Sequence, residues 1–155
     1  MHALKYRGWA ELAEFMAERM SREAFSHLED PVLVPVPTTS WRRRTRGYNQ
    51  ATILAQALAR RSSLPKVEAL LRGGGRTQVR LGPREREANV QGAFSLQVDF
   101  RSHIRGREVI LIDDVLTTGA TAVSAAKALA PGDPRSVHLR TFARALPFAP
   151  KGASG

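Results

Sequence analysis

The sequence has 155 residues and contains no cysteine, which excludes disulfide bonds and thiolate metal ligands. Aromatic residues make up only 6% of the chain. No apolar run is long enough to cross a membrane, and Glu11, Glu14 and Glu18 argue against a signal or transit peptide at the N-terminus. The four histidines lack the spacing of a metal site, so we interpret them as surface or packing residues. We therefore expect a cytoplasmic protein.

The chain is strongly basic, with a net charge of +10, and arginine supplies 20 of its 24 basic residues. Such an excess favours polyanionic partners, either nucleic acid or phosphorylated small molecules. A genome rich in G and C would raise the arginine content in the same way, so the charge alone leaves both explanations open. The hydrophobic fraction of 43% indicates one globular domain with a sizeable core.

Apolar spacing along the chain predicts alternating strands and helices. We predict helices at 9–25, 48–61 and 122–129, and strands at 32–37, 66–71, 92–100, 107–115 and 136–144. This order indicates an α/β fold, with a mostly parallel open sheet flanked by helices. Residues 1–146 form the predicted single domain, and the small, polar residues 147–155 are a predicted flexible tail.

Residues 72–91 interrupt this pattern with four glycines, a proline and five arginines, and they have no sustained apolar period. A connection of this length inside a compact domain is usually functional or disordered.

The stretch "LIDDVLTTGAT", residues 111–121, ends an apolar run in two adjacent acids, Asp113 and Asp114. In an open α/β sheet, ligands bind at the carboxyl ends of the strands. The following turn enters a helix, whose first N–H groups favour an anion such as phosphate. Phosphate would repel the two carboxylates, but carboxylates accept hydrogen bonds from vicinal hydroxyls. The pattern therefore predicts a phosphate attached to a diol, as in a ribose 5-phosphate.

Three alternatives are weaker. A P-loop nucleotide-binding site needs a glycine-rich loop that ends in Gly-Lys-Ser/Thr, and the sequence has none. The run Gly73–Gly75 lacks the spacing of a dinucleotide-binding fingerprint. An ordinary strand end with solvated acids, followed by a threonine cap, is the remaining alternative.

"VILIDDVLTTGAT", residues 109–121, resembles the phosphoribosyl pyrophosphate (PRPP) binding motif of the type I phosphoribosyltransferases. "RRRTRGYNQATILAQALA" at 42–59 and "QVRLGPREREANVQGAF" at 78–94 resemble the ComF family of competence-associated, phosphoribosyltransferase-like proteins. The resemblance covers residues 4–144. Members of that family often begin with a cysteine-rich, zinc-binding module, which this cysteine-free sequence lacks.

The resemblance implies a role for each part of the site. Asp113 and Asp114 would hold the ribose hydroxyls, and residues 117–121 would hold the 5-phosphate. The implied PRPP-binding set is Asp113, Asp114, Val115, Thr117, Thr118, Gly119, Ala120 and Thr121. The implied pyrophosphate-binding set is Pro37, Thr38, Thr39 and Arg46, while residues 72–91 correspond to a mobile loop that closes over the site.

The implied reaction is displacement of pyrophosphate from the anomeric carbon by a nitrogen nucleophile, with Mg²⁺ held by Asp113, Asp114 and ligand oxygens. Candidates to neutralise the leaving pyrophosphate are Arg72, Arg76, Arg80, Arg84 and Arg86, with Arg44 and Arg46. Arg86 and Arg46 are the preferred candidates because both fall inside matching motifs, and the implied catalytic set is Asp113, Asp114 and Arg86. The amides of Asn49 and Gln50 would either bind ligand or tie loops together.

The acceptor is not indicated, and a homodimer is common among the relatives that the resemblance implies. A second hypothesis is a non-enzymatic protein that keeps the fold and serves DNA uptake by binding single-stranded DNA through its basic surface. The cluster "WRRRTRG" at 41–47 and the positive charge favour it.

Overall fold

The computed structural model describes residues 2–21, 25–39, 45, 47–73 and 93–145. Its helices are α1 (His2–Ser21), α3 (Gln50–Ser62), α5 (Arg101–Ile104) and α6 (Ala120–Leu129), with 3₁₀ turns η1 (Phe25–His27), η2 (Val98–Phe100) and η3 (Ala130–Gly132). Its strands are β1 (Pro31–Pro35), β2 (Leu70–Arg72), β3 (Phe94–Leu96), β4 (Glu108–Leu116) and β5 (Ser136–Arg144). Within the described residues, no helix is long and apolar enough to cross a membrane.

The central sheet is parallel, with the strand order β1-β4-β5. It is extended beyond β1 by a bridge at Lys66, where the Leu33 N–H donates to the Pro65 carbonyl and the Val67 N–H donates to the Leu33 carbonyl, both at 2.9 Å. At the other edge, β5 has no strand neighbour beyond β4 in the part of the chain that the structure describes. The predicted open parallel sheet is therefore confirmed.

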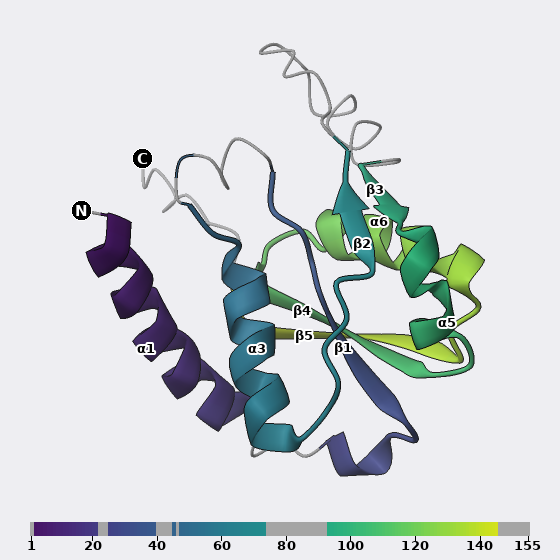
Figure 1. The fold of residues 1–155 in the computed structure, drawn as a ribbon, viewed down its shortest axis with the longest axis horizontal. Helices are drawn as coiled ribbons and strands as arrows, with labels where there is room; N and C mark the ends of the chain where they lie inside the picture. Colours follow the sequence, from purple (N-terminus) through teal and green to yellow (C-terminus); the bar gives the residue numbers. More distant parts are fainter. Residues whose placement is uncertain (1, 22–24, 40–44, 46, 74–92, 146–155) are drawn as a thin grey trace, which may run out of the picture.

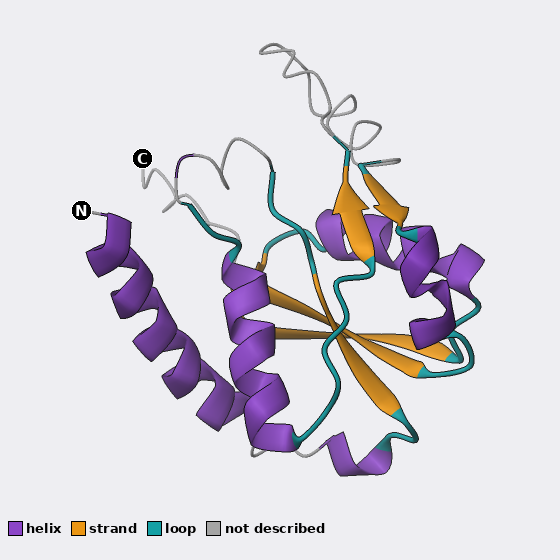
Figure 2. Cartoon of the chain, viewed as in Figure 1, coloured by secondary structure: helices purple, strands orange, loops and turns teal. Residues whose placement is uncertain are grey.

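Helices cover both faces of this sheet (Figures 1 and 2). Val109 and Leu111 of β4 pack on the side of α6 and the β2–β3 ribbon, whereas Ile110 and Ile112 pack on the side of α1 and α3. All four side chains are buried, because successive residues of a strand point to opposite faces and both faces are covered here. This explains why the β4 sequence is apolar without alternation.

Three predicted elements differ from the structure: the strands at 66–71 and 92–100 and the helix at 9–25. β2 and β3 form a separate antiparallel pair rather than joining the central sheet. The predicted strand at 92–100 ends at Leu96: after one further bond in the same register, from the Gln97 N–H to the Ala69 carbonyl, the chain turns into η2 and α5. α1 begins at His2, seven residues before its predicted start, and ends at Ser21 rather than at 25.

Candidate functional site

Asp113 and Asp114 lie in the last part of β4, where this strand continues past the end of β1. The pairing of β1 with β4 ends at Pro35 and Ile112, and the Val36 N–H makes one further bond of 2.9 Å to the Ile112 carbonyl. The acids are therefore next to an opening that β1 does not fill. The Asp114 N–H donates to Asp113 Oδ1, and the Val115 N–H donates to Asp114 Oδ1, both at 2.9 Å.

The turn from β4 into α6 depends on Gly119, the N-cap of α6. Its φ of 81° lies in the left-handed region that favours glycine. Because glycine has no side chain, it cannot cap the helix, and Thr118 Oγ1 accepts only a long 3.4 Å bond from the Ala120 N–H. α6 is ten residues long, and its N-terminus is therefore suited to binding an anion.

A cleft of ≈ 520 Å³ joins these segments to the end of β1 and the start of α3. Its lining includes eight of the predicted site residues: Pro37, Thr38, Thr39, Asp113, Asp114, Val115, Thr117 and Thr121. Thr118, Gly119 and Ala120 shape the turn and do not line the cleft. Arg46 and Arg86 lie outside the described residues, as do Arg44, Arg76, Arg80, Arg84 and the segment 74–92.

Asn49 lines the cleft and ties two of its walls together. Its Nδ2 donates to the Val36 carbonyl at 3.1 Å and to Thr52 Oγ1 at 2.9 Å. These bonds join the end of β1 to the first turn of α3, which favours the loop-tying interpretation for Asn49. Gln50 and Ala51 line the cleft beside it.

Arg72 is the cationic side chain among the described residues of the cleft lining. It ends β2, and its Nη1 donates to the Pro37 carbonyl at 3.4 Å. Its guanidinium lies over the Phe94 ring, 4.9 Å from the centroid. Arg72 was one of seven arginines named as candidates from the sequence, and the structure brings this one to the cleft.

The pKa of Asp113 is raised to about 6, chiefly by burial and in smaller part by the neighbouring Asp114 charge. The Asp114 N–H and the positive charge of Arg72 lower the pKa and oppose this rise in part. A carboxylate in this position is stabilised by hydroxyl donors or a cation. The described residues contain no cluster of three or more potential metal-ligating side chains, so a metal held here would need oxygens from a ligand as well.

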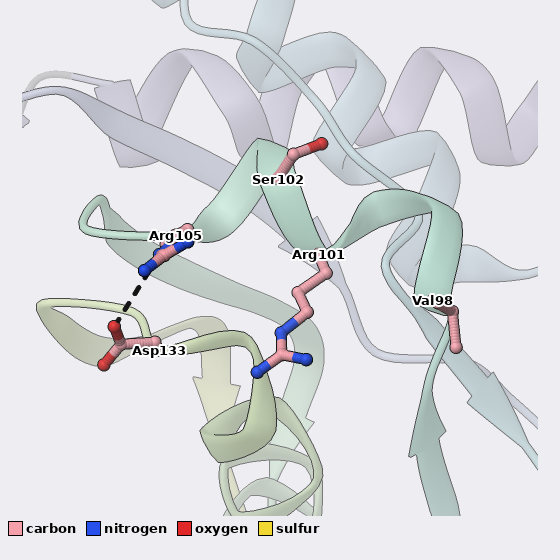
Figure 3. A pocket seen from close by; sticks show the side chains of 5 residues that line it. All are labelled: Val98, Arg101, Ser102, Arg105 and Asp133. Atoms are coloured by element: carbon pink, nitrogen blue, oxygen red, sulfur yellow. Dashed lines mark ion pairs between the residues drawn. The ribbon is translucent and has the colours of Figure 1, made fainter.

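A second cavity, of ≈ 460 Å³, lies between η2, α5 and η3 (Figure 3). Arg105 and Asp133 form an ion pair of 3.9 Å at its rim, and both side chains are about three-quarters exposed. Arg101, Ser102 and Val98 complete the lining, and Val98 is 82% exposed. No sequence motif falls on this cavity and its charges partly cancel, so we place the candidate site in the first cleft.

The phosphoribosyl transferase domain family matches residues 10–147. The chain belongs to this family. This phosphoribosyl transferase domain is 31% identical to Competence protein F of Haemophilus influenzae over 133 residues, which are 84% of the chain and 58% of the relative. It is 35% identical to Competence protein ComFC of Bacillus subtilis, covering 81% of the chain and 50% of the relative. These similarities confirm the ComF resemblance.

The domain is also 30% identical to the DNA utilization protein YhgH of Escherichia coli K12, covering 94% of the chain and 66% of the relative. The chain thus spans between half and two thirds of the length of these curated relatives.

Solved structures with the same fold include one described as the allosteric regulatory enzyme of purine biosynthesis, with a TM-score of 0.55, 20% identity and coverage of 84% of the chain and 25% of that protein. Glutamine PRPP amidotransferase from Bacillus subtilis gives a TM-score of 0.54 at 20% identity, covering 86% of the chain and 26% of that protein. At this identity the likeness establishes the type I phosphoribosyltransferase fold alone. The chemistry has to be argued from the residues of the site.

Proposed function

We propose that this domain binds PRPP with Mg²⁺ and transfers its phosphoribosyl group to a nitrogen acceptor, releasing pyrophosphate. The observation that carries the proposal is that Asp113 and Asp114 line one cleft together with Thr117 and Thr121, which flank the turn into α6. Carboxylates suit the two ribose hydroxyls, and the helix start suits the 5-phosphate.

Each part of PRPP has a matching chemical group in the cleft. Thr117 and Thr121 offer hydroxyl donors beside the start of α6. Pro37, Thr38 and Thr39 form the opposite wall, next to Arg72. We assign this wall to the pyrophosphate, because a guanidinium matches paired phosphate oxygens.

Asp113 and Asp114 would hold the Mg²⁺ together with oxygens of PRPP. Two protein carboxylates are consistent with magnesium, which usually keeps one or two such ligands and takes the rest from phosphates and water. The ion would supply positive charge to the leaving pyrophosphate.

The transfer forms a bond between the acceptor nitrogen and the anomeric carbon and breaks the bond from that carbon to the pyrophosphate oxygen. The bonding electrons leave with pyrophosphate, and the acceptor nitrogen loses its proton. The contribution of the chain is to fix the ribose and to place Arg72 near the developing negative charge, which is where preorganised cations lower a barrier most.

Calorimetric titration of the protein with PRPP in the presence of Mg²⁺ tests the binding step. We expect saturable binding, and a loss of at least about 100-fold in affinity when both Asp113→Asn and Asp114→Asn are introduced, since two charge-assisted contacts are removed. Asp99→Asn, the same change at an exposed residue of η2, is the matched control and should leave the affinity unchanged. A folded wild-type protein that shows no PRPP affinity would contradict the proposal.

Pyrophosphate release in the presence of PRPP and a panel of nucleobases and amines tests the transfer step. One acceptor should accelerate release, and the Asp113→Asn, Asp114→Asn protein should not respond to it. PRPP binding without release for any acceptor would limit the function to sensing PRPP.

A second candidate function is binding of single-stranded DNA. The net charge of +10 favours it, as do the relatives described as competence and DNA utilization proteins. Binding driven by phosphate contacts weakens steeply with salt. We expect the affinity for an oligonucleotide to fall about 10-fold or more between 50 and 200 mM salt; an affinity that does not change over this range would rule it out.

A further inference from the structure

We propose that Phe94 is a positioning residue, which holds the Arg72 guanidinium at the wall of the cleft where the pyrophosphate of PRPP would bind. This inference rests on the proposed function. It adds a structural reason why the domain would bind PRPP more tightly than ribose 5-phosphate.

Arg72 and Phe94 are opposite each other in the antiparallel pairing of β2 with β3. Directly opposed residues of such a pair project from the same face, so their side chains meet. The guanidinium carbon lies 4.9 Å from the centre of the Phe94 ring, within the range of a cation–π interaction. The two residues are 22 positions apart in sequence, so the contact exists only when both strands are paired.

Phe94 is itself fixed, because it is 6% exposed and belongs to the core on the α6 face of the sheet. It does not line the cleft, whereas Arg72 does. The buried Phe94 ring thus contacts the Arg72 guanidinium, which lines the cleft. Arg72 Nη1 also donates to the Pro37 carbonyl at 3.4 Å, which brings the guanidinium to the wall assigned to pyrophosphate.

The arrangement matters because a free arginine side chain has many rotamers, and ordering it on binding costs free energy. A guanidinium that already stacks on a fixed ring loses less freedom when a ligand arrives. This smaller entropic cost strengthens the binding of PRPP, whose pyrophosphate would contact Arg72. It does not strengthen the binding of ribose 5-phosphate, which has no pyrophosphate. Leucine at position 94 would still fill much of the core volume but would lack the negative ring face that attracts the cation.

The test compares the affinities of PRPP and ribose 5-phosphate, measured by calorimetry with Mg²⁺, for wild type, Phe94→Leu, Arg72→Gln and the double variant. We expect Phe94→Leu to weaken PRPP about fivefold, which is the scale of one cation–π contact. Ribose 5-phosphate affinity should change less than about twofold. Arg72→Gln should weaken PRPP more than Phe94→Leu does, and adding Phe94→Leu to it should cause no further loss, because the two residues act as a unit.

Phe100→Leu is the matched control, since Phe100 packs against the same core cluster and its ring contact is with His103 rather than with an arginine. It should leave both affinities unchanged. Phe94→Tyr keeps the ring and should retain wild-type PRPP affinity, which keeps the proposal testable if Phe94→Leu does not fold.

If Phe94→Leu lowers the affinities for PRPP and ribose 5-phosphate equally, the inference is overturned and the proposed function stands. The same holds if the losses of PRPP affinity from the two substitutions add up in the double variant. A wild-type protein that binds ribose 5-phosphate and PRPP equally well would also overturn it. Absence of binding of either ligand by the wild-type protein would overturn the proposed function and this inference together.

Discussion

Asp113 is an aspartate whose surroundings make it a weaker acid. Its carboxyl is taken out of water at the end of a buried strand, and Asp114 lies next to it. The folded chain therefore holds a proton on Asp113 up to about pH 6, whereas the unfolded chain releases it near pH 3.8. Between these values the folded state binds more protons, so the free energy of unfolding decreases as the pH rises through this range and stays lower above it.

We expect Asp113→Asn to stabilise the magnesium-free protein at pH 8, because the amide removes a charge that is unfavourable in the folded state. The increase in the free energy of unfolding should be on the order of 1 kcal/mol larger at pH 8 than at pH 4, with allowance for partial solvent screening. Denaturant unfolding at both pH values measures it, with Asp99→Asn as the control. A gain that is larger at pH 4 than at pH 8 would contradict this account.

Gly119 sets the turn that presents the start of α6. Replacing it with alanine places a Cβ on a residue with φ of 81°, a conformation that costs roughly 1 kcal/mol for a non-glycine residue. We expect Gly119→Ala to lower stability by about this amount and to weaken ribose 5-phosphate binding as well. Gly8→Ala, in the exposed part of α1 where nothing lies within 4 Å, is the control and should not lower stability. Equal behaviour of the two variants would show that the turn does not depend on glycine.

At the scale of elements, the sequence indicated the central-sheet strands β4 and β5 well. β4, whose apolar run is buried on both faces, lies within one residue of its predicted bounds, and β5, whose residues are half-buried or exposed, has the predicted bounds. The acids and threonines of the β4–α6 turn followed from the same local pattern. By contrast, the β2–β3 pair joins strands on either side of residues 74–92, and no local pattern indicates which residues pair across such a distance. The Arg72–Phe94 contact depends on that pairing and could not be predicted for the same reason.

Asn49 joins two elements and should matter for both stability and binding. Asn49→Ala removes the bonds to the Val36 carbonyl and to Thr52, and we expect a loss of about 1–2 kcal/mol in the free energy of unfolding. Because the end of β1 leads into Pro37–Thr39, PRPP affinity should also fall. Gln97→Ala, which removes an exposed amide bond to the Glu68 carbonyl, should lower stability less and leave PRPP affinity unchanged. Unfolding and calorimetry on the same samples make the comparison.

The contact between η3 and α5 leaves no room for a larger residue at position 132. A Cβ added to Gly132 would lie 2.9 Å from Ile104 Cγ1 and closer still to its Cδ1, and Ile104 is fully buried. We expect Gly132→Ala to cost about 1–3 kcal/mol in stability, because overpacking forces neighbours to move. PRPP affinity at a temperature where the variant is folded should be unchanged, since neither Gly132 nor Ile104 lines the cleft. Wild-type stability in this variant would mean that Ile104 can move without cost.

At the scale of the whole molecule, the cleft is lined by the segment after β1 and by residues of α3, β2, β4 and α6, so a ligand bound there contacts most of the elements of the fold. Ligand binding to the folded state alone raises its stability. At about 100 times the dissociation constant, PRPP should add roughly 2.7 kcal/mol, or roughly 5–10 °C in the unfolding midpoint. A thermal-shift measurement with Mg²⁺ tests this, and the variant carrying Asp113→Asn with Asp114→Asn should show no shift. An equal shift in both proteins would place the binding elsewhere.

In the part of the chain that the structure describes, β5 is an edge strand of the central sheet, and this has a consequence for solubility. β5 carries Arg140 and Arg144 along its outer part, beside Phe142, which is 40% exposed. An uncovered strand can recruit an identical strand from another molecule, and charged side chains discourage this by mutual repulsion. Arg140 and Arg144 would therefore hinder the pairing of β5 with the same strand of another molecule. The variant with Arg140→Thr and Arg144→Thr should precipitate sooner on storage and keep its ligand affinity.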